Sequence, residues 1–382
     1  MREAVIVSAV RTPVGRRKGV FRNIHPVELA AVALREVTER VAVEKGFIDD
    51  IVMGCVTPIG EQGYNIGRLA ALRAGFPVEV PAVTINRMCG SGQQALHFAV
   101  QEVKSGDMDV TIAAGVESMT RVPMLSDGGD QTIPPALASQ YEFVHQGISA
   151  ELIAKKWDLS REELDAYAYE SHRRALQAIS LGKFSEEIVP VTGHDAEGNE
   201  INVYVDEGPR ADTSLQRLGA LQPVFRQDGV ITAGNASQMS DGAAAVLVMA
   251  EERAAQLEVK PRARIVSQAV VGSDPTMMLD GVIPATRKAL KRAGLNIADI
   301  DLVEINEAFA PVVLAWQKAL EADLSKVNVN GGAIALGHPL GATGAKLITS
   351  LLHELERRNG RYGLLTICIG HGQSTATIIE RI

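Results

Sequence analysis

"VTINRMCGSGQQALHFAV", spanning residues 83–100, joins a short β-branched run to a segment with helical periodicity. The run that contains its start, "PAVTI", is bounded by proline and is typical of a buried strand. Apolar residues then recur at the spacing of one helix face, at Ala95, Leu96, Ala99, Val100 and Val103. The sequence therefore predicts a strand, a tight turn and a helix, with Cys89 at the junction.

A thiol at this junction has a chemical use. Unpaired N–H groups and the positive dipole end of a helix favour an anion, so we expect the pKa of Cys89 to lie below the ~8.5 of a free thiol. Gly90 and Gly92 would supply backbone freedom at the turn. The alternative is an inert core residue, the commoner state of a free cysteine. The other cysteines, Cys55 and Cys368, are too distant in sequence for a C-x-x-C motif or a zinc knuckle.

The same pattern recurs near the end of the chain. "VNVNGGAIALGHPLGATGAKLITSL" at 327–351 is the counterpart of the first segment. Three further pairs follow in the same order: "EAVIVSAVRTPVG" with "RARIVSQAVVG", "FIDDIVMGCV" with "IADIDLVEINEAF", and "DVTIAAGVES" with "GLLTICIGHG". Each copy alternates apolar strands with amphipathic helices, which predicts two duplicated α/β halves, each with a largely parallel sheet.

Between the copies lies a polar segment that contains proline and glycine. Its one clear helical stretch is "SREELDAYAYESHRRALQAIS", which begins at a cap on Ser160. We interpret this segment as an insertion that covers a site. The predicted division is a first half made of 1–118 and 239–260, an inserted domain at 119–238, and a second half at 261–382.

A pseudo-twofold arrangement of the halves would bring equivalent strand ends together. Cys89 of the first copy would then meet His338 and Cys368 of the second. His338 lies in "GGAIALGHPLGATG", whose five glycines would permit a ligand to approach the backbone closely. A lone histidine is more often structural, but this loop and the apposed thiol favour catalysis. The stretch "GATGAK" is no phosphate loop, because that motif needs glycine directly before Lys346 and Ser or Thr after it.

Composition limits the other function classes. The chain has 382 residues, 46% of them hydrophobic and 22% charged, as in ordinary globular proteins. A net charge of -8 argues against nucleic acid as the main partner. We also see no basic leader at the start and no unbroken apolar stretch of the ~18 residues that a membrane span needs. We therefore expect a cytoplasmic protein without a membrane span and without a metal site.

Five motifs occur in order, "NRMCGSGQQA", "GNAS", "NEAFA", "GGAIALGHPLGATGAK" and "CIGHG", after the opening "EAVIVSAVRTPVG". With them the chain resembles the thiolases over nearly its entire length. The resemblance implies two duplicated five-layered α/β/α/β/α halves and a loop domain that helps to hold coenzyme A. It also implies that the chain makes or breaks the carbon-carbon bond of 3-ketoacyl-CoA by a ping-pong mechanism. Coenzyme A would be a substrate, no cofactor would be bound permanently, and the enzyme would be a homodimer or homotetramer.

The resemblance also assigns catalytic roles. Cys89 would be the nucleophile that carries the acyl group, His338 the base that activates it, and Cys368 the second acid/base. One oxyanion site would be His338 with a water held by Asn306 of "NEAF", and the other would be the backbone N–H groups of Cys89 and Gly370.

Contacts with coenzyme A follow from the same resemblance. It places Ser237 beside the pantetheine, Arg210 near the adenine end and His145 at the pocket wall. The alternatives are a helix N-cap for Ser237 and a solvated charge for Arg210. Cys55 is expected to be a core residue.

Three positions depart from the acetoacetyl-CoA-forming members of the family. Gln146 stands in place of a common Met, Gln238 in place of Gly, and His371 interrupts a triple glycine. These changes leave acyl chain length and direction open. The ending "GQSTATIIERI" is closer to degradative members, so thiolysis is favoured over the alternative, formation of acetoacetyl-CoA. A decarboxylating condensing enzyme and a non-catalytic acyl-CoA-binding protein are the remaining alternatives.

Overall fold

The protein, described here from a computed structural model that covers residues 2–382, is built around two related arrays of strands. The first array has the order β4-β3-β5-β8-β1. Its strands are β4 (Val83–Ile85), β3 (Asp50–Gly54), β5 (Val110–Ser118), β8 (Ser240–Ala250) and β1 (Ala4–Arg11). A short strand, β2 (Gly15–Arg16), pairs with β8.

The second array repeats this topology. It comprises β10 (Leu302–Ile305), β11 (Tyr362–Ile369), β12 (Gln373–Arg381) and β9 (Ala263–Gly272), in that order. A parallel bridge between Val303 and Val327 lies where the first array has β4. From β3 to β1, and likewise from β10 to β9, successive strand pairs are parallel, antiparallel and antiparallel. The duplication predicted from the sequence is therefore confirmed. Pairing between β1 and β9 joins the arrays into one ten-stranded sheet.

In each array one strand is reversed: β8 is antiparallel to both β5 and β1, and β12 is antiparallel to both β11 and β9. The remaining strands of each array run in the same direction, as the predicted largely parallel sheets require. One detail of the strand prediction is wrong, because the strand before Cys89 is not buried. Val83 of β4 is 42% exposed, since β4 pairs only with β3 and forms the edge of the sheet.

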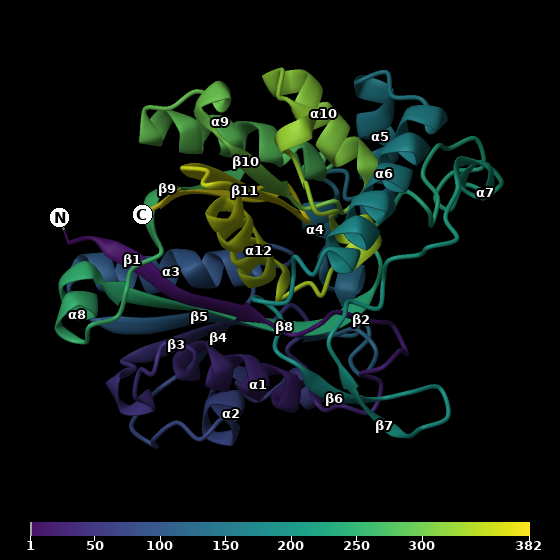
Figure 1. The fold of residues 1–382 in the computed structure, drawn as a ribbon. Coiled ribbons are helices and arrows are strands. Elements are labelled where there is room, and N and C mark those ends of the chain that lie inside the picture. The colour runs from purple at the N-terminus through teal and green to yellow at the C-terminus, as the bar shows by residue number, and fades with distance from the viewer. Residues whose placement is uncertain (1) are drawn as a thin grey trace.

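Helices separate and cover the two arrays, which gives five layers in all (Figure 1). One outer layer contains α1 (Pro26–Glu39) and α2 (Ile66–Arg73), and the other contains α9 (Val282–Ala293) and α10 (Ala310–Leu320). The central layer contains α3 (Ser91–Ser105) and α12 (Thr343–Arg358). Each half supplies one of these two central helices, so the five layers belong to the molecule as a whole.

Glycines let the central helices cross closely. A Cβ on Gly344 would lie 1.9 Å from the backbone N of Gln93, and one on Gly92 would lie 2.7 Å from the carbonyl O of Gly341. A Cβ on Gly115 would lie 2.1 Å from the same Gly341 oxygen. We expected the glycines near His338 to make room for a ligand, but Gly341 and Gly344 make room for the backbone of the other half.

Segment 119–238 contains most of the remaining elements. They are α4 (Pro135–Ala138), α5 (Gln146–Lys156), α6 (Arg161–Ser180), β6 (Val191–His194), β7 (Glu200–Val203) and α7 (Leu215–Gly219). Ser160 and Glu163 form a capping box at the start of α6, as the sequence predicts. The short helices α8 (Glu251–Gln256) and α11 (Ala333–Leu336) lie outside this segment.

Candidate active site

Cys89 lies in a tight turn immediately before α3, with Gly90 as the N-cap residue. The turn is held by two hydrogen bonds, from Met88 N to Asn86 Oδ1 at 2.7 Å and from Ser91 Oγ to Met88 O at 2.6 Å. Met88, not a glycine, has the left-handed conformation, with φ of 45°. A non-glycine residue in this region is held there by its surroundings, and the position beside the nucleophile is typical of functional sites.

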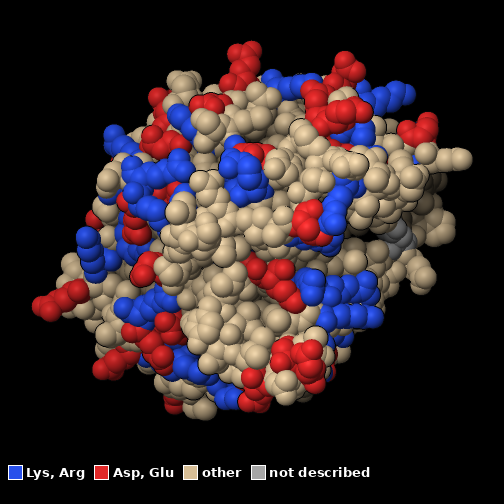
Figure 2. All heavy atoms as spheres, turned by 45° about the vertical axis from the view of Figure 1, so that its right-hand side comes forward, with Lys and Arg blue, Asp and Glu red and all other residues tan. Residues whose placement is uncertain are grey.

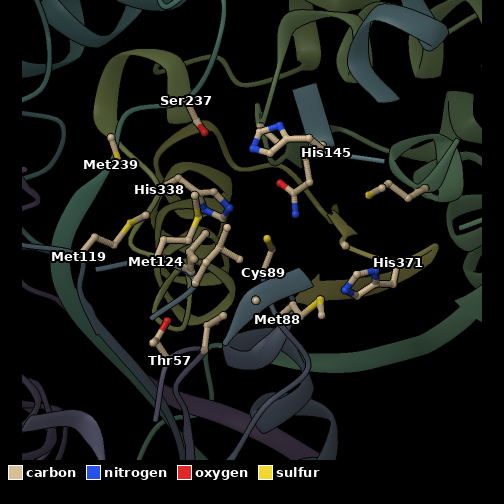
Figure 3. Close-up of a pocket in the computed structure, with 18 of the residues that line it drawn as sticks. Thr57, Met88, Cys89, Met119, Met124, His145, Ser237, Met239, His338 and His371 are labelled. Carbon is tan, nitrogen blue, oxygen red and sulfur yellow. The ribbon is translucent and has the colours of Figure 1, made fainter. Parts of the chain in front are cut away.

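The turn directs Cys89 into a cavity of about 330 Å³. In Figure 3 its sulfur points into the open space, with His338 on one side and Met88 and His371 on the other. Gly370 also lines this cavity. The chain therefore brings the predicted nucleophile, the predicted base and one predicted oxyanion donor to a single space between the two halves.

Hydrogen bonds define the tautomer of His338. Thr343 Oγ1 donates to the carbonyl O of Pro339 at 2.9 Å, so its lone pairs remain free to accept the proton on His338 Nδ1, 2.6 Å away. Asn306 Nδ2 lies 3.3 Å from His338 Nε2 and donates to it. The imidazole is thus neutral, protonated at Nδ1, with Nε2 as the basic atom. Burial, and next the charge of Lys346, lower the pKa of His338 to about 3.

The expectation of a depressed pKa at Cys89 is wrong. Burial raises the pKa of this thiol to about 11, and the nearby charge of Glu117 adds to the rise. Hydrogen bonds from the backbone N–H groups of Cys89 and Gly370, and from the side chain of Gln146, act in the opposite direction. Desolvation outweighs the effect of the helix start here, so the site holds a neutral thiol beside a neutral imidazole.

Cys368 lies next to the end of β11 and is fully buried. Burial raises the pKa of its thiol, and the proximity of Cys89 raises it further, while a hydrogen bond from Asn306 lowers it. Asn306 therefore contacts both His338 and Cys368. The four predicted groups Cys89, His338, Cys368 and Asn306 come together, each from a different loop or strand end.

Glu117 is a site residue that the sequence analysis missed. Its carboxylate, fully buried at the end of β5, accepts hydrogen bonds from the backbone N–H groups of Val56, Thr57 and Gly341 and from Gln62 Nε2. It thereby ties the loop that carries His338 to the first half. An acidic residue at the end of the apolar strand "VTIAAGVES" was the available signal.

The predicted coenzyme A contacts fall in two places. Ser237 and His145 line the cavity with Cys89, and the imidazole of His145 stacks on Phe225 at a centroid distance of 5.0 Å. Ser237 does not begin a helix, so the N-cap alternative is wrong. Arg210 is exposed and lines a neighbouring cavity of about 260 Å³. Gln238 borders both cavities.

The structure accommodates the two unusual residues at the former glycine positions. Gln238 Nε2 donates to the carbonyl oxygens of Gly208, Ile334 and Ala335 at 2.9 to 3.0 Å, which links the segment before Arg210 to α11. His371 adopts a left-handed backbone with φ of 58°, as expected where glycine is usual. Its ring packs edge-on against Phe143, with centroids 5.5 Å apart.

Residues 2–382 show neither a metal-binding cluster nor a helix able to span a membrane. No group of three or more His, Cys, Asp or Glu side chains is arranged to hold a metal ion in this range. None of the helices in the same range is long and apolar enough to cross a membrane. On the face drawn in Figure 2, basic side chains are interleaved with acidic ones around large uncharged areas.

Family comparisons agree with this geometry. The thiolase N-terminal domain matches residues 4–252 and the thiolase C-terminal domain matches residues 259–381. Together they span nearly the whole chain. The protein belongs to the thiolase family and has the thiolase fold, and it is an acyltransferase.

Individual relatives cover the chain completely. A steroid 3-ketoacyl-CoA thiolase of Mycobacterium tuberculosis is 50% identical over 393 residues, which include 100% of this chain and 95% of the relative. A 3-ketoacyl-CoA thiolase of Citrobacter koseri is 48% identical over 390 residues and 100% of both chains. The solved structure of an acetyl-CoA acetyltransferase of Bacillus anthracis superposes with a TM-score of 0.92 at 40% identity, covering 100% of this chain and 99% of the other.

Proposed function

We propose that this thiolase cleaves 3-ketoacyl-CoA with coenzyme A, to give acetyl-CoA and a shortened acyl-CoA, through an acyl-Cys89 intermediate. The observation that carries the proposal is the meeting of two thiols with one neutral histidine. Cys89 lines the cavity beside His338, and Cys368 lies behind them, joined to His338 through Asn306. One thiol can then act as nucleophile while the other moves protons.

Acylation begins with transfer of the Cys89 proton to His338 Nε2, the free base of the tautomer described above. The resulting thiolate attacks the 3-keto carbon, and the C2–C3 bond breaks with its electron pair on C2 of acetyl-CoA. Cys368 supplies the proton that converts this enolate to acetyl-CoA, which leaves Cys368 as a thiolate. The N–H groups of Cys89 and Gly370, which lie near enough to the Cys89 sulfur to lower its pKa, are proposed to stabilise negative oxygen on the acyl group.

Deacylation restores both thiols. The incoming coenzyme A thiol gives its proton to the Cys368 thiolate and attacks the thioester carbon of acyl-Cys89. Cys89 departs as a thiolate and takes back the proton held on His338, which returns the site to its starting state. No permanently bound cofactor enters this cycle, since coenzyme A is itself a substrate.

The cavity supports binding of the pantetheine arm along Ser237 and His145, which face it from the side of segment 119–238. Arg210 lies further out, beyond Gln238, where a negatively charged nucleotide end of coenzyme A would extend. We therefore propose that Ser237 and His145 contact the pantetheine arm and that Arg210 contacts the nucleotide end of coenzyme A.

The residues that line the cavity support a degradative enzyme that accepts varied acyl chains. Five of the chain's ten methionines line it: Met88, Met119, Met124, Met239 and Met278. Methionine is unbranched and flexible, so such a wall can adapt to acyl groups of different length and shape. The relatives named 3-ketoacyl-CoA thiolase, one of them for steroid substrates, support the same direction. Formation of acetoacetyl-CoA is the second candidate, supported by the similar acetyl-CoA acetyltransferase.

The deciding experiment compares thiolysis rates over a series of 3-ketoacyl-CoA substrates with the rate of condensation of two acetyl-CoA molecules. We expect kcat/KM for thiolysis to be higher with substrates longer than acetoacetyl-CoA, and condensation to be slow. A preference for acetoacetyl-CoA over every longer substrate would instead assign the biosynthetic role. Absence of both reactions, with decarboxylation of a malonyl thioester, would assign a condensing enzyme.

The proposal extends to a cytoplasmic enzyme that forms homodimers or homotetramers, as thiolases usually do. Size-exclusion chromatography with light scattering measures the oligomeric state directly. A monomer at micromolar concentration would contradict this part of the proposal and leave the chemistry untouched.

A further inference from the structure

Gln146, the first residue of α5, lies with its side-chain amide close to the nucleophile. It lines the cavity together with Cys89, and its amide is near enough to the sulfur to lower the pKa of that thiol. A Cβ built on Gly370 would lie 3.1 Å from Gln146 Nε2, so the amide also lies against the predicted oxyanion donor.

The amide has no evident structural task. Within residues 2–382 the Gln146 side chain makes no hydrogen bond to another nitrogen or oxygen atom, and the residue is only partly buried. The start of α5 is capped by its neighbour, since His145 Nδ1 accepts the N–H of Gly147 at 3.1 Å. An amide that is not needed for the helix and is directed at a reacting sulfur points to a role in the reaction.

That role concerns the charge that develops on sulfur. The thiolate of Cys89 has to form in a buried place near the carboxylate of Glu117, and both features oppose a negative charge. Each N–H group aimed at the sulfur offsets this cost, because hydrogen bonds to an ionised acceptor are about twice as strong as neutral ones. The Cys89 and Gly370 backbone groups supply two such donors, and Gln146 supplies a third.

We propose that Gln146 is a catalytic residue of this thiolase, whose amide donates to the Cys89 sulfur as the thiol becomes a thiolate. The inference deepens the proposed function, since it rests on Cys89 as the nucleophile. Proton transfer from Cys89 to His338 then costs less than it would with an apolar residue at position 146. The same donor holds the sulfur in line with the cavity during attack on the keto carbon.

The test is the Gln146→Met variant, with Gln146→Leu as a second apolar form and Gln216→Met in α7 as the matched control on an exposed surface. The rate of alkylation of Cys89 is followed by mass spectrometry of its peptide at several pH values, with iodoacetamide and with methyl methanethiosulfonate. We expect both Gln146 variants to react about tenfold more slowly with both reagents at the same pH, since one unit of pKa changes the thiolate fraction tenfold. Gln216→Met should react at the wild-type rate.

Steady-state kinetics supply a second measurement. Thiolysis by Gln146→Met should show a kcat about tenfold lower with a KM for coenzyme A within about threefold of wild type, because the donor acts on the reacting sulfur and not on bound coenzyme A. Wild-type alkylation rates in both apolar variants would overturn the inference. Slowing with only one reagent would also overturn it, since that result indicates altered access and not altered charge. Alkylation needs no thiolase turnover, so failure of the proposed function would leave this readout intact.

Discussion

His338 depends on Thr343 for its chemistry. The chain from His338 Nδ1 through the Thr343 hydroxyl to the Pro339 carbonyl leaves Nε2 unprotonated and turned toward Asn306. Without that acceptor the imidazole could adopt the other tautomer, and a base protonated at Nε2 cannot take the Cys89 proton. Thr343 therefore takes part in the mechanism by holding the tautomer of His338.

We predict that Thr343→Val lowers kcat for thiolysis by roughly 100-fold, a typical contribution of one positioned acid/base group, with little change in KM. The matched control is Thr349→Val on the same helix, because the Thr349 hydroxyl donates only to the carbonyl O of Ala345. Steady-state kinetics on both variants check the prediction. Equal kcat values for the two would show that the tautomer of His338 is not set by Thr343.

The three thiols differ in burial and in nearby donors. Burial raises the pKa of Cys89 to about 11 and raises those of Cys55 and Cys368 further. Of the three cysteines, Cys89 is the one that lines the cavity. Cys55 is buried away from it, which agrees with the prediction that Cys55 is a core residue. Reactivity toward an alkylating agent should follow this order.

Iodoacetamide should therefore label Cys89 before Cys55 and Cys368, and its rate should rise about tenfold per pH unit between pH 7 and 9, because the thiolate fraction grows in that proportion below the pKa. Bound acyl-CoA should protect Cys89. Peptide mass spectrometry at each pH measures the rates. A rate that levels off below pH 8 would restore the depressed pKa that the sequence pattern suggested.

At the scale of secondary structure, the crossing of α3 and α12 holds the site together. Cys89 precedes α3 and His338 precedes α12, so the geometry of the crossing sets the position of the nucleophile relative to the base. The crossing is close because Gly344 lies directly against the backbone of Gln93. A backbone neighbour cannot rotate away as a side chain can.

The substitution Gly344→Ala should accordingly lower the free energy of unfolding by about 3 kcal/mol or more, the upper part of the range for overpacking a core. Gly219→Ala in α7 is the control, since a Cβ there meets nothing within 4 Å and should change stability by less than about 0.5 kcal/mol. Chemical denaturation measures both. Similar stability of the two variants would show that the helices can separate at little cost.

Sequence reasoning succeeded where the pattern was local or repeated. It predicted that the strands of the first half recur in the same order along the chain in the second half, and it predicted the cap at Ser160, because these signals are carried by local patterns of residues. It misjudged the strand at Val83, since the edge of a sheet is a property of the assembled array. It also misread the glycines near His338, whose neighbours, such as Gln93, lie some 250 positions away in the chain.

The features of the active site also divide into those that local motifs predict and those that depend on the assembled fold. Cys89, His338 and Cys368 were predicted from their motifs, and the structure brings them together. The pKa of Cys89, the tautomer of His338 and the buried carboxylate of Glu117 depend on burial and on partners from the other half. Those features appear only when the whole fold is present.

At the scale of the whole molecule, the site exists because two similar halves face each other. The first half supplies the nucleophile at the start of α3. The second supplies the base before α12 and the second thiol at the end of β11. The central claim is that the two thiols have different jobs: Cys89, before α3 of the first half, carries the acyl group, and Cys368, near the end of β11 of the second half, moves the proton at the acetyl carbon.

Half-reactions of Cys89→Ser and Cys368→Ser test this claim most directly. Acylation of Cys89 by acetyl-CoA releases coenzyme A as a thiolate, which can take its proton from His338 when the Cys368 thiol is absent, whereas the enolate released by cleavage of the carbon-carbon bond needs a proton donor at C2. Cys368→Ser should therefore still gain the mass of an acetyl group on the Cys89 peptide, yet thiolyse acetoacetyl-CoA at less than about one hundredth of the wild-type rate. Cys89→Ser should fail both assays. Wild-type thiolysis by Cys368→Ser would contradict the account and return Cys368 to the role of a buried core residue.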